Sequence, residues 1–362
     1  MTSQSQQEQR YVRIITFLLK WLYARGLVLY AALSGKSFYC NVLTGDSTIN
    51  TVINSDLSVS CTCLDKDGTG KIGDLHAQGL AEIFSGERAN SFRKALAQGR
   101  LPIHCCAGCI ERRWIKKGSA DAYLRNYHLP VAITVENTAE CNMSCLYCHR
   151  DQIYKNRRKR SMSLDEMRLV SRAICENHIK YIAYVNFGEP FISQTIKQEL
   201  EIIKNENPEV SMMTSTNGTM LDSQEKMEAA LYFDHIYFSI DGSTQESLHR
   251  YQHNGDFDAA YRNMKALVGL RNTRNKKRPV IEWKYVLFRW NDSHRLISRA
   301  IELARAAKVD RLSFWPTVVP IDGISYRYYL GLSRARRVGT PSKKNIYYDN
   351  WMGREIDFRE VG

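Results

Sequence analysis

Short β-rich segments alternate with longer helical segments between residue 130 and about residue 316. The predicted strands are 131–136, 181–187, 209–216, 235–240, 280–288 and 311–315, and the predicted helices are one from Ser163 and those at 194–205, 223–233, 258–270 and 294–308. This order predicts an α/β fold with a parallel sheet and right-handed crossovers. Six strands are too few for a closed eight-stranded barrel, so the pattern favours a partial barrel or a doubly wound sheet. In both, ligands bind at the carboxyl ends of the strands.

The composition is that of a folded globular protein with an excess of basic residues. The chain has 362 residues, of which 44% are hydrophobic and 25% charged, and its net charge is +13. Length alone suggests about two domains. The basic residues gather in runs at 155–160, 271–278 and 334–337, which favour anionic partners. Helix-turn-helix, zinc-finger and RNA-binding signatures are missing, so no specific nucleic-acid partner is predicted.

Residues 11–35 are the one candidate for membrane contact. Arg13, Lys20 and Arg25 interrupt this apolar stretch, and a spanning helix would bury them at a cost. We therefore expect no transmembrane span, with packing on the protein as the main alternative and interfacial binding as another. The sequence shows no signal peptide with a cleavage site, and clustered cysteines without one indicate a cytoplasmic metalloprotein.

Three cysteines gather in the stretch AECNMSCLYCHRD at 139–151. Cys141, Cys145 and Cys148 follow a predicted strand with the spacing C-x3-C-x2-C. Three thiolates that converge suit a cubane iron–sulfur cluster and leave one iron without a protein ligand. Structural zinc would need a fourth ligand, a role that His149 could fill.

With this loop, residues 130–317 resemble the radical SAM superfamily. The resemblance implies a partial (βα)6 barrel of the TIM type and a [4Fe-4S] cluster whose open iron binds S-adenosylmethionine (SAM). It also implies reductive cleavage of SAM to a 5′-deoxyadenosyl radical that abstracts hydrogen from a substrate. In such enzymes the cofactor supplies the chemistry and the protein supplies its position.

Three further motifs strengthen the resemblance, because each follows a predicted strand at the same edge of the sheet. FGEP at 187–190 resembles the Gly-Gly-Glu-Pro element of the family, with Phe187 in place of the first glycine. TSTNGT at 214–219 and FSIDGS at 238–243 resemble its Thr-Asn-Gly and Ser-Ile-Asp-Gly turns. By resemblance, the residues that position SAM are Gly188, Glu189, Pro190, Thr216, Asn217, Ser239 and Asp241.

Gln252 departs from the family pattern, and Tyr147 matches it but has an alternative interpretation. Many relatives have an arginine about eleven residues past the aspartate of the fourth motif, and here Gln252 occupies that place. Glutamine donates hydrogen bonds but lacks the charge, so either Arg250 substitutes or Gln252 holds the methionine carboxylate less strongly. Tyr147 matches a family residue near the adenine, with core packing as its alternative. Cys175, within a predicted helix, is read as a structural thiol.

Six cysteines precede the barrel and form a second group. The passage that contains them resembles the SPASM or twitch auxiliary-cluster domain of radical SAM proteins, here in an N-terminal position. The resemblance implies that Cys40, Cys61, Cys106 and Cys109 ligate a second [4Fe-4S] cluster, with Cys63 and Cys105 as alternatives. Zinc stays open because a C-x2-C pair suits both metals.

The predicted organisation has four parts. They are an amphipathic helical segment at 1–35, an auxiliary-cluster domain at 36–129, the radical SAM core at 130–319 and an extension at 320–362 that covers the barrel. Within the auxiliary domain we expect a pair of strands around 50–63 and a helix near 77–98.

The predicted reaction is hydrogen abstraction from a saccharide-type or peptide substrate, which the basic runs suggest is anionic. Reduced flavodoxin or ferredoxin would donate the electron, and the auxiliary cluster would transfer electrons. The alternatives are a radical SAM activase or methyltransferase and a metal-binding scaffold without activity. Tyr285, Arg289 and Trp315 are candidates for the substrate cavity, although strand residues face either side of a sheet.

Overall fold

The structure, a computed structural model, describes residues 18, 21–47, 50–341 and 353–359. Six parallel strands form its centre in the order β6, β8, β9, β10, β12, β13. Their bounds are β6 (Ala132–Val135), β8 (Tyr181–Ala183), β9 (Ser211–Thr216), β10 (His235–Ser239), β12 (Val280–Leu287) and β13 (Arg311–Pro316). All six predicted strands are present, and the predicted partial barrel is confirmed.

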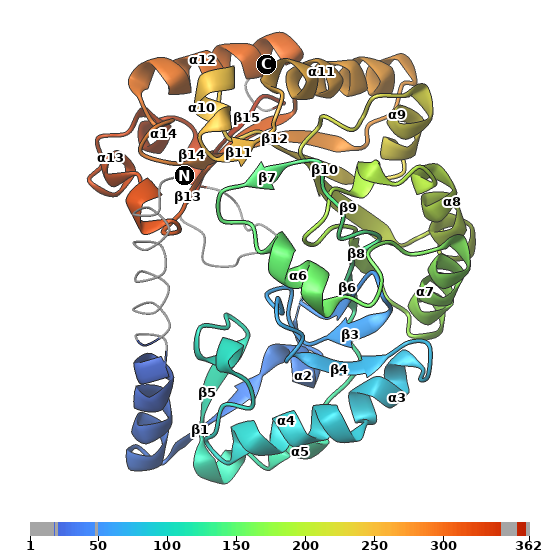
Figure 1. The fold of residues 1–362 in the computed structure, drawn as a ribbon, viewed down its shortest axis with the longest axis vertical. Helices are drawn as coiled ribbons and strands as arrows, with labels where there is room; N and C mark the ends of the chain where they lie inside the picture. The colour runs from blue at the N-terminus through green and yellow to red at the C-terminus, as the bar shows by residue number, and fades with distance from the viewer. Residues whose placement is uncertain (1–17, 19–20, 48–49, 342–352, 360–362) are drawn as a thin grey trace.

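Five helices follow these strands and cover the outer side of the sheet (Figure 1). They are α7 (Leu164–Glu176), α8 (Ile196–Glu206), α9 (Gln224–Ala230), α11 (Phe257–Thr273) and α12 (His294–Ala307). The predicted capping box begins α7, because Ser163 Oγ accepts from the Glu166 backbone N–H while Glu166 Oε2 accepts from the Ser163 N–H at 2.6 Å. The sequence therefore marks this helix start correctly.

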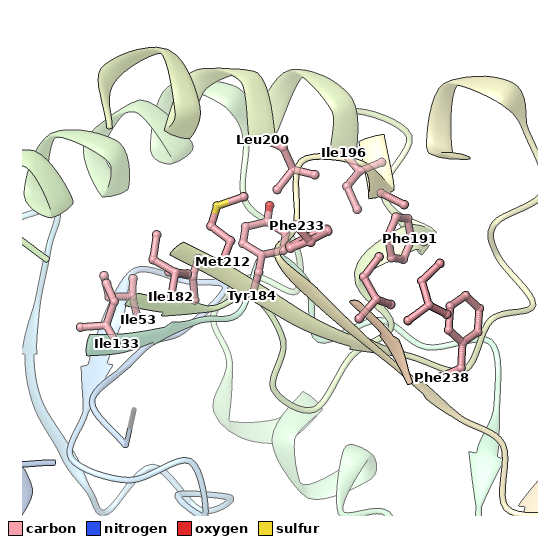
Figure 2. Close-up of a cluster of buried hydrophobic side chains, with 14 of the residues drawn as sticks. Ile53, Ile133, Ile182, Tyr184, Phe191, Ile196, Leu200, Met212, Phe233 and Phe238 are labelled. Carbon is pink, nitrogen blue, oxygen red and sulfur yellow. The ribbon is translucent and has the colours of Figure 1, made fainter. Parts of the chain in front are cut away.

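The two sides of the sheet carry different side chains. On β12, Ile281, Trp283 and Tyr285 belong to the main core between sheet and helices. Figure 2 shows part of that core, with Ile182 of β8, Met212 of β9 and Leu200 of α8 among its side chains. On the inner side, Ala132, Ala183, Met213, Tyr237 and Trp315 form a second, smaller cluster with Val286 packed against it. Because side chains alternate along a strand, Glu282, Lys284 and Val286 face the interior.

Residues before the barrel extend its sheet. β2 (Val52–Ile53) pairs in parallel with β6, and β3 (Ser58–Ser60) and β4 (Lys71–Asp74) continue beyond it in antiparallel pairs. Ile53 joins the same core as Ile133 of β6 (Figure 2). Sheet and core thus continue across residue 130, and the division into domains at that residue stays a prediction.

The rest of residues 36–129, called here the cysteine-rich part, is an antiparallel pair of strands with helices packed on it. β1 (Lys36–Cys40) pairs with β5 (Arg112–Lys116), near α2 (Asn41–Thr44) and α5 (Ala122–Arg125). The helix predicted near 77–98 is two helices, α3 (Leu80–Ser85) and α4 (Glu87–Ala97), because the extended backbone of Gly86 ends the first and begins the second. The strands predicted around 50–63 are β2 and β3.

The basic run at 155–160 binds acids of its own chain. Arg157 forms a buried ion pair with Glu136 at 2.9 Å and donates to Asn54 Oδ1 at 2.6 Å. Four of its five basic side chains lie within ion-pair distance of acids, the other pairs being Arg158 with Asp56 and Asp74, Lys159 with Glu166 and Arg160 with Glu140. The charge of this run is therefore largely offset, and Arg157 joins the cysteine-rich part to the barrel.

The C-terminal part begins after β13 and returns to its edge. The short helices α13 (Tyr326–Tyr329) and α14 (Arg334–Arg337) precede β14 (Thr340–Pro341) and β15 (Arg354–Asp357), and β15 pairs antiparallel with β13. The predicted extension at 320–362 is described except for 342–352 and 360–362. Whether it covers the barrel stays a prediction.

The N-terminal segment is described only in part. Residues 21–33 are helical, and the rest of the predicted 1–35 segment, apart from residues 18 and 34–35, lies outside the described residues. Among the described residues, no helix has the length and apolar character that a membrane span requires.

Candidate active site

The cysteine loop lies on the inner side of the arc of strands, with β7 (Ser144–Cys145) and α6 (Arg150–Asn156) (Figure 1). β7 pairs antiparallel with β11 (Gln252–His253), which brings Cys145 opposite Gln252. The Leu146 N–H also donates to the Tyr251 carbonyl at 2.9 Å. The fourth motif region therefore anchors the loop at the barrel mouth.

The three thiols of the loop lie near one another. Burial raises the pKa of Cys145 to about 12, with further increases from Asp241, Cys148 and Cys141. Burial also raises the pKa of Cys141, and Cys148 adds to that shift. A metal cation bound by these thiols would favour their thiolate forms.

Arg150, to which the sequence analysis gave no role, holds the cysteine loop through hydrogen bonds. Its Nη1 donates to the Cys141 carbonyl at 2.8 Å and to the Met143 carbonyl, and its Nη2 donates to Ser144 Oγ at 3.2 Å. The guanidinium charge lowers the pKa of Cys141 and of Cys145, against the larger effect of burial. Its place two residues after Cys148 was the available signal, although spacing alone gave no role to it.

The second motif packs directly on the cysteine loop. A Cβ at Gly188 would lie 2.0 Å from the Thr138 carbonyl oxygen, so only glycine fits there. The Glu189 N–H donates to the Glu140 carbonyl at 2.8 Å. Pro190 is buried at the start of the following 3-10 turn. This close approach explains the glycine of the motif and holds the two loops together.

Glu189 connects the second and third motifs. Its carboxylate accepts from Thr216 Oγ1 at 2.7 Å, from the Asn217 N–H at 2.7 Å and from the Phe191 N–H at 3.2 Å. Burial raises its pKa to about 7, although these hydrogen bonds oppose the shift. The carboxylate thus fixes the backbone of the Thr-Asn-Gly turn.

Asn217 then ties the third motif to the cysteine loop. Its Nδ2 donates to Asn142 Oδ1 at 2.9 Å, and Asn142 Nδ2 donates to Thr219 Oγ1 at 2.8 Å. Asn142 lies between the first two cysteines in sequence. A side-chain network therefore runs from Glu189 through Asn217 to the loop.

The fourth motif is held by Gln252. Its Nε2 donates to the Ser239 carbonyl at 2.9 Å and its Oε1 accepts from the Asp241 N–H at 2.9 Å. Asp241 accepts from the Val286 N–H at 2.9 Å, and burial raises its pKa to about 6. Arg250 instead forms an exposed ion pair with Glu246 at 3.3 Å. The amide of Gln252 thus bonds main chain at both ends, while a SAM contact for it or for Arg250 stays a prediction.

Tyr147 and the three cavity candidates lie in different places. Tyr147 is exposed and donates to Asp322 Oδ1 at 3.2 Å, which links the cysteine loop to the C-terminal part. Trp315 lies in the inner cluster, whereas Tyr285 packs on the helix side and donates to the Asn291 carbonyl at 2.9 Å. Arg289 is exposed beyond the end of β12. The prediction of Tyr285 as a cavity residue is therefore wrong. Tyr285 follows Lys284 directly on β12, so the two side chains face opposite sides of the sheet.

The second cysteine site is an apolar cavity in the cysteine-rich part. Cys40, Cys61, Cys105, Cys106 and Cys109 line it together with Leu43, Phe92, Leu96 and Ile103. Burial raises the pKa of Cys61 well above the usual value, and Cys40, Cys106 and Cys109 add to that shift. The four predicted ligands thus lie together.

The two remaining cysteines of this group turn toward other partners. The Cys63 thiol donates to Asn50 Oδ1 at 2.9 Å, and Cys63 is not among the residues that line the cavity. Cys105 gathers with Asp67 and His104, whose ligand atoms all lie within 4.8 Å of one another. Cys63 thus lies outside the cavity, whereas Cys105 lines it and also has these other partners. Cluster ligation by any of the six stays a proposal.

A comparison with known protein families supports the assignment of the site at the barrel mouth. Residues 135–278 match the Radical SAM superfamily. This chain carries a radical SAM domain. The domain runs from the end of β6 to the residues just before β12, and it includes all four motifs. Enzymes of this superfamily use a [4Fe-4S] cluster and SAM, which the three neighbouring thiols and the connected turns fit.

The relatives are similar over short stretches. A "Probable GTP 3',8-cyclase" of Methanothermobacter marburgensis is 34% identical over 98 residues, which are 27% of this chain and 31% of that protein. The same name belongs to a protein of Methanocaldococcus jannaschii that is 25% identical over 138 residues, 38% of this chain and 45% of that one. The chain thus spans less than half the length of either relative.

One solved structure also aligns with this chain. The crystal structure of archaeal TYW1 has a TM-score of 0.36 and 13% identity, and the alignment covers 58% of this chain and 70% of that one. The superfamily match does not include residues 36–129. A SPASM or twitch assignment for those residues stays a prediction.

Proposed function

We propose that this protein is a radical SAM enzyme that abstracts hydrogen from a saccharide-type or peptide substrate. Cys141, Cys145 and Cys148 hold the catalytic [4Fe-4S] cluster. When bound, the cluster and SAM supply reductive cleavage of the sulfonium and a radical that removes hydrogen. The main support is that hydrogen bonds connect the second and third motifs to the cysteine loop, and that β11 pairs with β7 beside the fourth.

The chain's own residues position these groups. Arg150 fixes the carbonyls of the cysteine loop and favours the thiolates by charge. Glu189 and Asn217 hold the turn beside which SAM lies, and Glu189 places negative charge where the cationic methionine ammonium binds. Ser239 and Asp241, fixed by Gln252, complete the rim.

A second [4Fe-4S] cluster at Cys40, Cys61, Cys106 and Cys109 is part of the proposal. Four thiols within one apolar cavity supply a complete ligand set without an open position. A cluster with all four ligands suits electron transfer to or from the substrate radical. Reduced flavodoxin or ferredoxin is the proposed electron donor.

A second candidate substrate is a phosphate-bearing nucleotide. The relatives named GTP 3',8-cyclase support this alternative, since that name describes action on a nucleoside triphosphate. Incubation with GTP and analysis of the products by mass spectrometry separates the two candidates, because a cyclised nucleotide has a distinct mass and retention time.

The test of the proposed reaction is anaerobic reconstitution with iron and sulfide, followed by reduction in the presence of SAM. The proposal predicts 5′-deoxyadenosine and methionine as products, and about eight iron atoms per chain from two four-iron clusters. S-Adenosylhomocysteine would indicate a methyltransferase instead. Iron at residues 141–148 without any cleavage of SAM would refute the proposal.

A further inference from the structure

Lys284 is a cation in the interior of the barrel. It lies on β12, three residues before the last residue of that strand, with Ser239 opposite it on β10 and Ser313 opposite it on β13. Its Nζ lies 4.2 Å from the centre of the Trp315 ring. Trp315 belongs to the inner apolar cluster, so the ammonium group lies against an aromatic side chain of the barrel interior.

The acidic side chains nearest to Lys284 form their hydrogen bonds with other residues. Asp241 accepts from the Val286 N–H at 2.9 Å. Glu282 accepts from Ser313 Oγ and lies 3.1 Å from His235 Nε2. Within the described residues, Lys284 has no side-chain hydrogen bond or ion pair, and its one specific contact is with the Trp315 ring.

An ammonium group in this setting is suited to receive an anion. Removing a charged group from water is unfavourable unless a partner compensates it, and burial lowers the pKa of Lys284 while Asp241 and Glu282 oppose that shift. Ser239 lies opposite Lys284 on β10, and its hydroxyl shares a hydrogen bond of 2.9 Å with Ser215 in which either oxygen can donate. A carboxylate or phosphate would replace the lost hydration of the ammonium with charge-assisted hydrogen bonds.

Lys284 faces the interior just inside the barrel mouth. Its partner on β10 is Ser239, the last residue of that strand. Its ammonium contacts Trp315, which lies one residue before the end of β13. Glu189, Asn217 and Asp241 lie beyond the ends of their strands, so an anion bound by Lys284 would lie next to the turns that are proposed to hold SAM.

We infer that Lys284 is the binding residue for an anionic group of the substrate, a carboxylate or a phosphate. The inference rests on the proposed function and deepens it by giving the chemical class of the substrate. Trp315 supports the ammonium through a cation–π contact. The specificity of the site thus depends on a charge that the motif residues do not supply.

The test uses the reconstituted full-length protein with the cluster reduced, which makes it paramagnetic, and without SAM, which the reduced cluster would cleave. The probes are inorganic phosphate, followed by phosphorus NMR, and carbon-13-labelled acetate, followed by carbon NMR. Each probe nucleus relaxes faster when it binds near the cluster. The probe with the larger effect tells whether the site prefers phosphate or carboxylate.

We expect the wild type to enhance relaxation of at least one probe, and Lys284→Gln to weaken that binding about tenfold or more, as expected for loss of a charged hydrogen bond. Lys284→Arg keeps the charge and should retain most of the effect. Lys265→Gln, which removes an exposed lysine on α11, is the matched control and should behave like the wild type. The SAM dissociation constant should stay within about twofold in all three variants.

Three results would overturn the inference. One is equal relaxation of the probes in wild type and Lys284→Gln, and another is no enhancement by the wild type. The third is a loss of SAM affinity in Lys284→Gln with unchanged probe binding, which would assign the lysine to the SAM carboxylate. Absence of 5′-deoxyadenosine from the wild type would instead refute the proposed function, so the two failures are distinguishable.

Discussion

The two cysteine sites differ in what surrounds their sulfur atoms. The loop at the barrel mouth brings three thiols together beside Arg150, Glu189 and Asp241, and polar side chains connect it to the neighbouring turns. The upstream site brings five cysteines, the four predicted ligands and Cys105, into a cavity lined by leucine, isoleucine and phenylalanine side chains. One environment is charged and hydrogen-bonded, and the other is apolar.

This difference agrees with the different roles that we propose for the two sites. A site that must bind and release a charged sulfonium compound needs polar groups at an open iron, and the rim supplies them. A site that only transfers electrons benefits from complete thiolate ligation and exclusion of water, since burial and hydrogen bonding set the cluster potential. Substitutions that affect one site and spare the other test this division.

The largest expected effect is the loss of the auxiliary cluster in Cys61→Ala. Cys61 is buried, and the other three predicted ligands surround it. Iron content should fall by about four atoms per chain, since a site with three thiolates holds a cubane cluster poorly in this apolar cavity. Cleavage of SAM without substrate should continue. Cys63→Ala is the matched control, and full iron in Cys61→Ala would contradict the assignment.

The next largest effect is expected at the contact between the cysteine-rich part and the barrel, the two parts that hold the cysteine sites. Arg157→Leu leaves the Glu136 carboxylate buried beside β2 without its ion pair, which should destabilise the protein by about 3–5 kcal/mol. Denaturant unfolding under anaerobic conditions measures the loss. Arg158→Leu removes an exposed ion pair from the same run and should cost no more than about 1 kcal/mol. Equal effects of the two substitutions would show that the buried pair does not join the parts.

Glu189→Gln should weaken SAM binding by about tenfold, or about 1.4 kcal/mol. The amide keeps the size of the side chain but removes the negative charge, and its NH2 group cannot accept from Thr216 or Asn217. Equilibrium dialysis with labelled SAM measures the change, and iron content should stay constant. Glu140→Gln, at a half-buried position near the loop, should change the affinity less than about twofold. Unchanged affinity in Glu189→Gln would remove this carboxylate from the SAM site.

The smallest effect is expected for Cys105→Ser. The Cys105 thiol lies beside His104 and Asp67, although Cys105 also lines the cavity of the four predicted ligands. Iron content and the absorption of the auxiliary cluster should match those of the wild type. If Cys105→Ser loses about four iron atoms per chain, Cys105 and not one of the four predicted cysteines is a ligand.

Much of the barrel and its rim could be predicted from the sequence, because strand and helix periodicity reports burial directly. The alternation from residue 130 gave the six strands, and their ends placed the four motifs at one edge. The facing of side chains on β12 could not be predicted in this way. The strand has large side chains on both sides, so Tyr285 and Lys284 gave no pattern that distinguishes the interior from the helix side.

The sequence also could not predict which residues form ion pairs and hydrogen bonds with residues far away in the chain. The run at 155–160 suggested an anion-binding surface, yet Arg157 pairs with Glu136 and Arg158 with Asp74. Gln252 looked like a weak substitute for an arginine, although its amide fixes the backbone of the fourth motif. Each of these contacts joins residues at least 11 positions apart in the chain.

The most direct test compares 5′-deoxyadenosine formation by Cys145→Ala and Cys106→Ala, both reconstituted and reduced alongside the wild type. The account predicts that Cys145→Ala forms none while it keeps the spectrum of the auxiliary cluster. Cys106→Ala should lose that cluster and still cleave SAM. Cleavage of SAM by Cys145→Ala, or its loss only in Cys106→Ala, would contradict the assignment of the catalytic cluster to the loop at the barrel mouth.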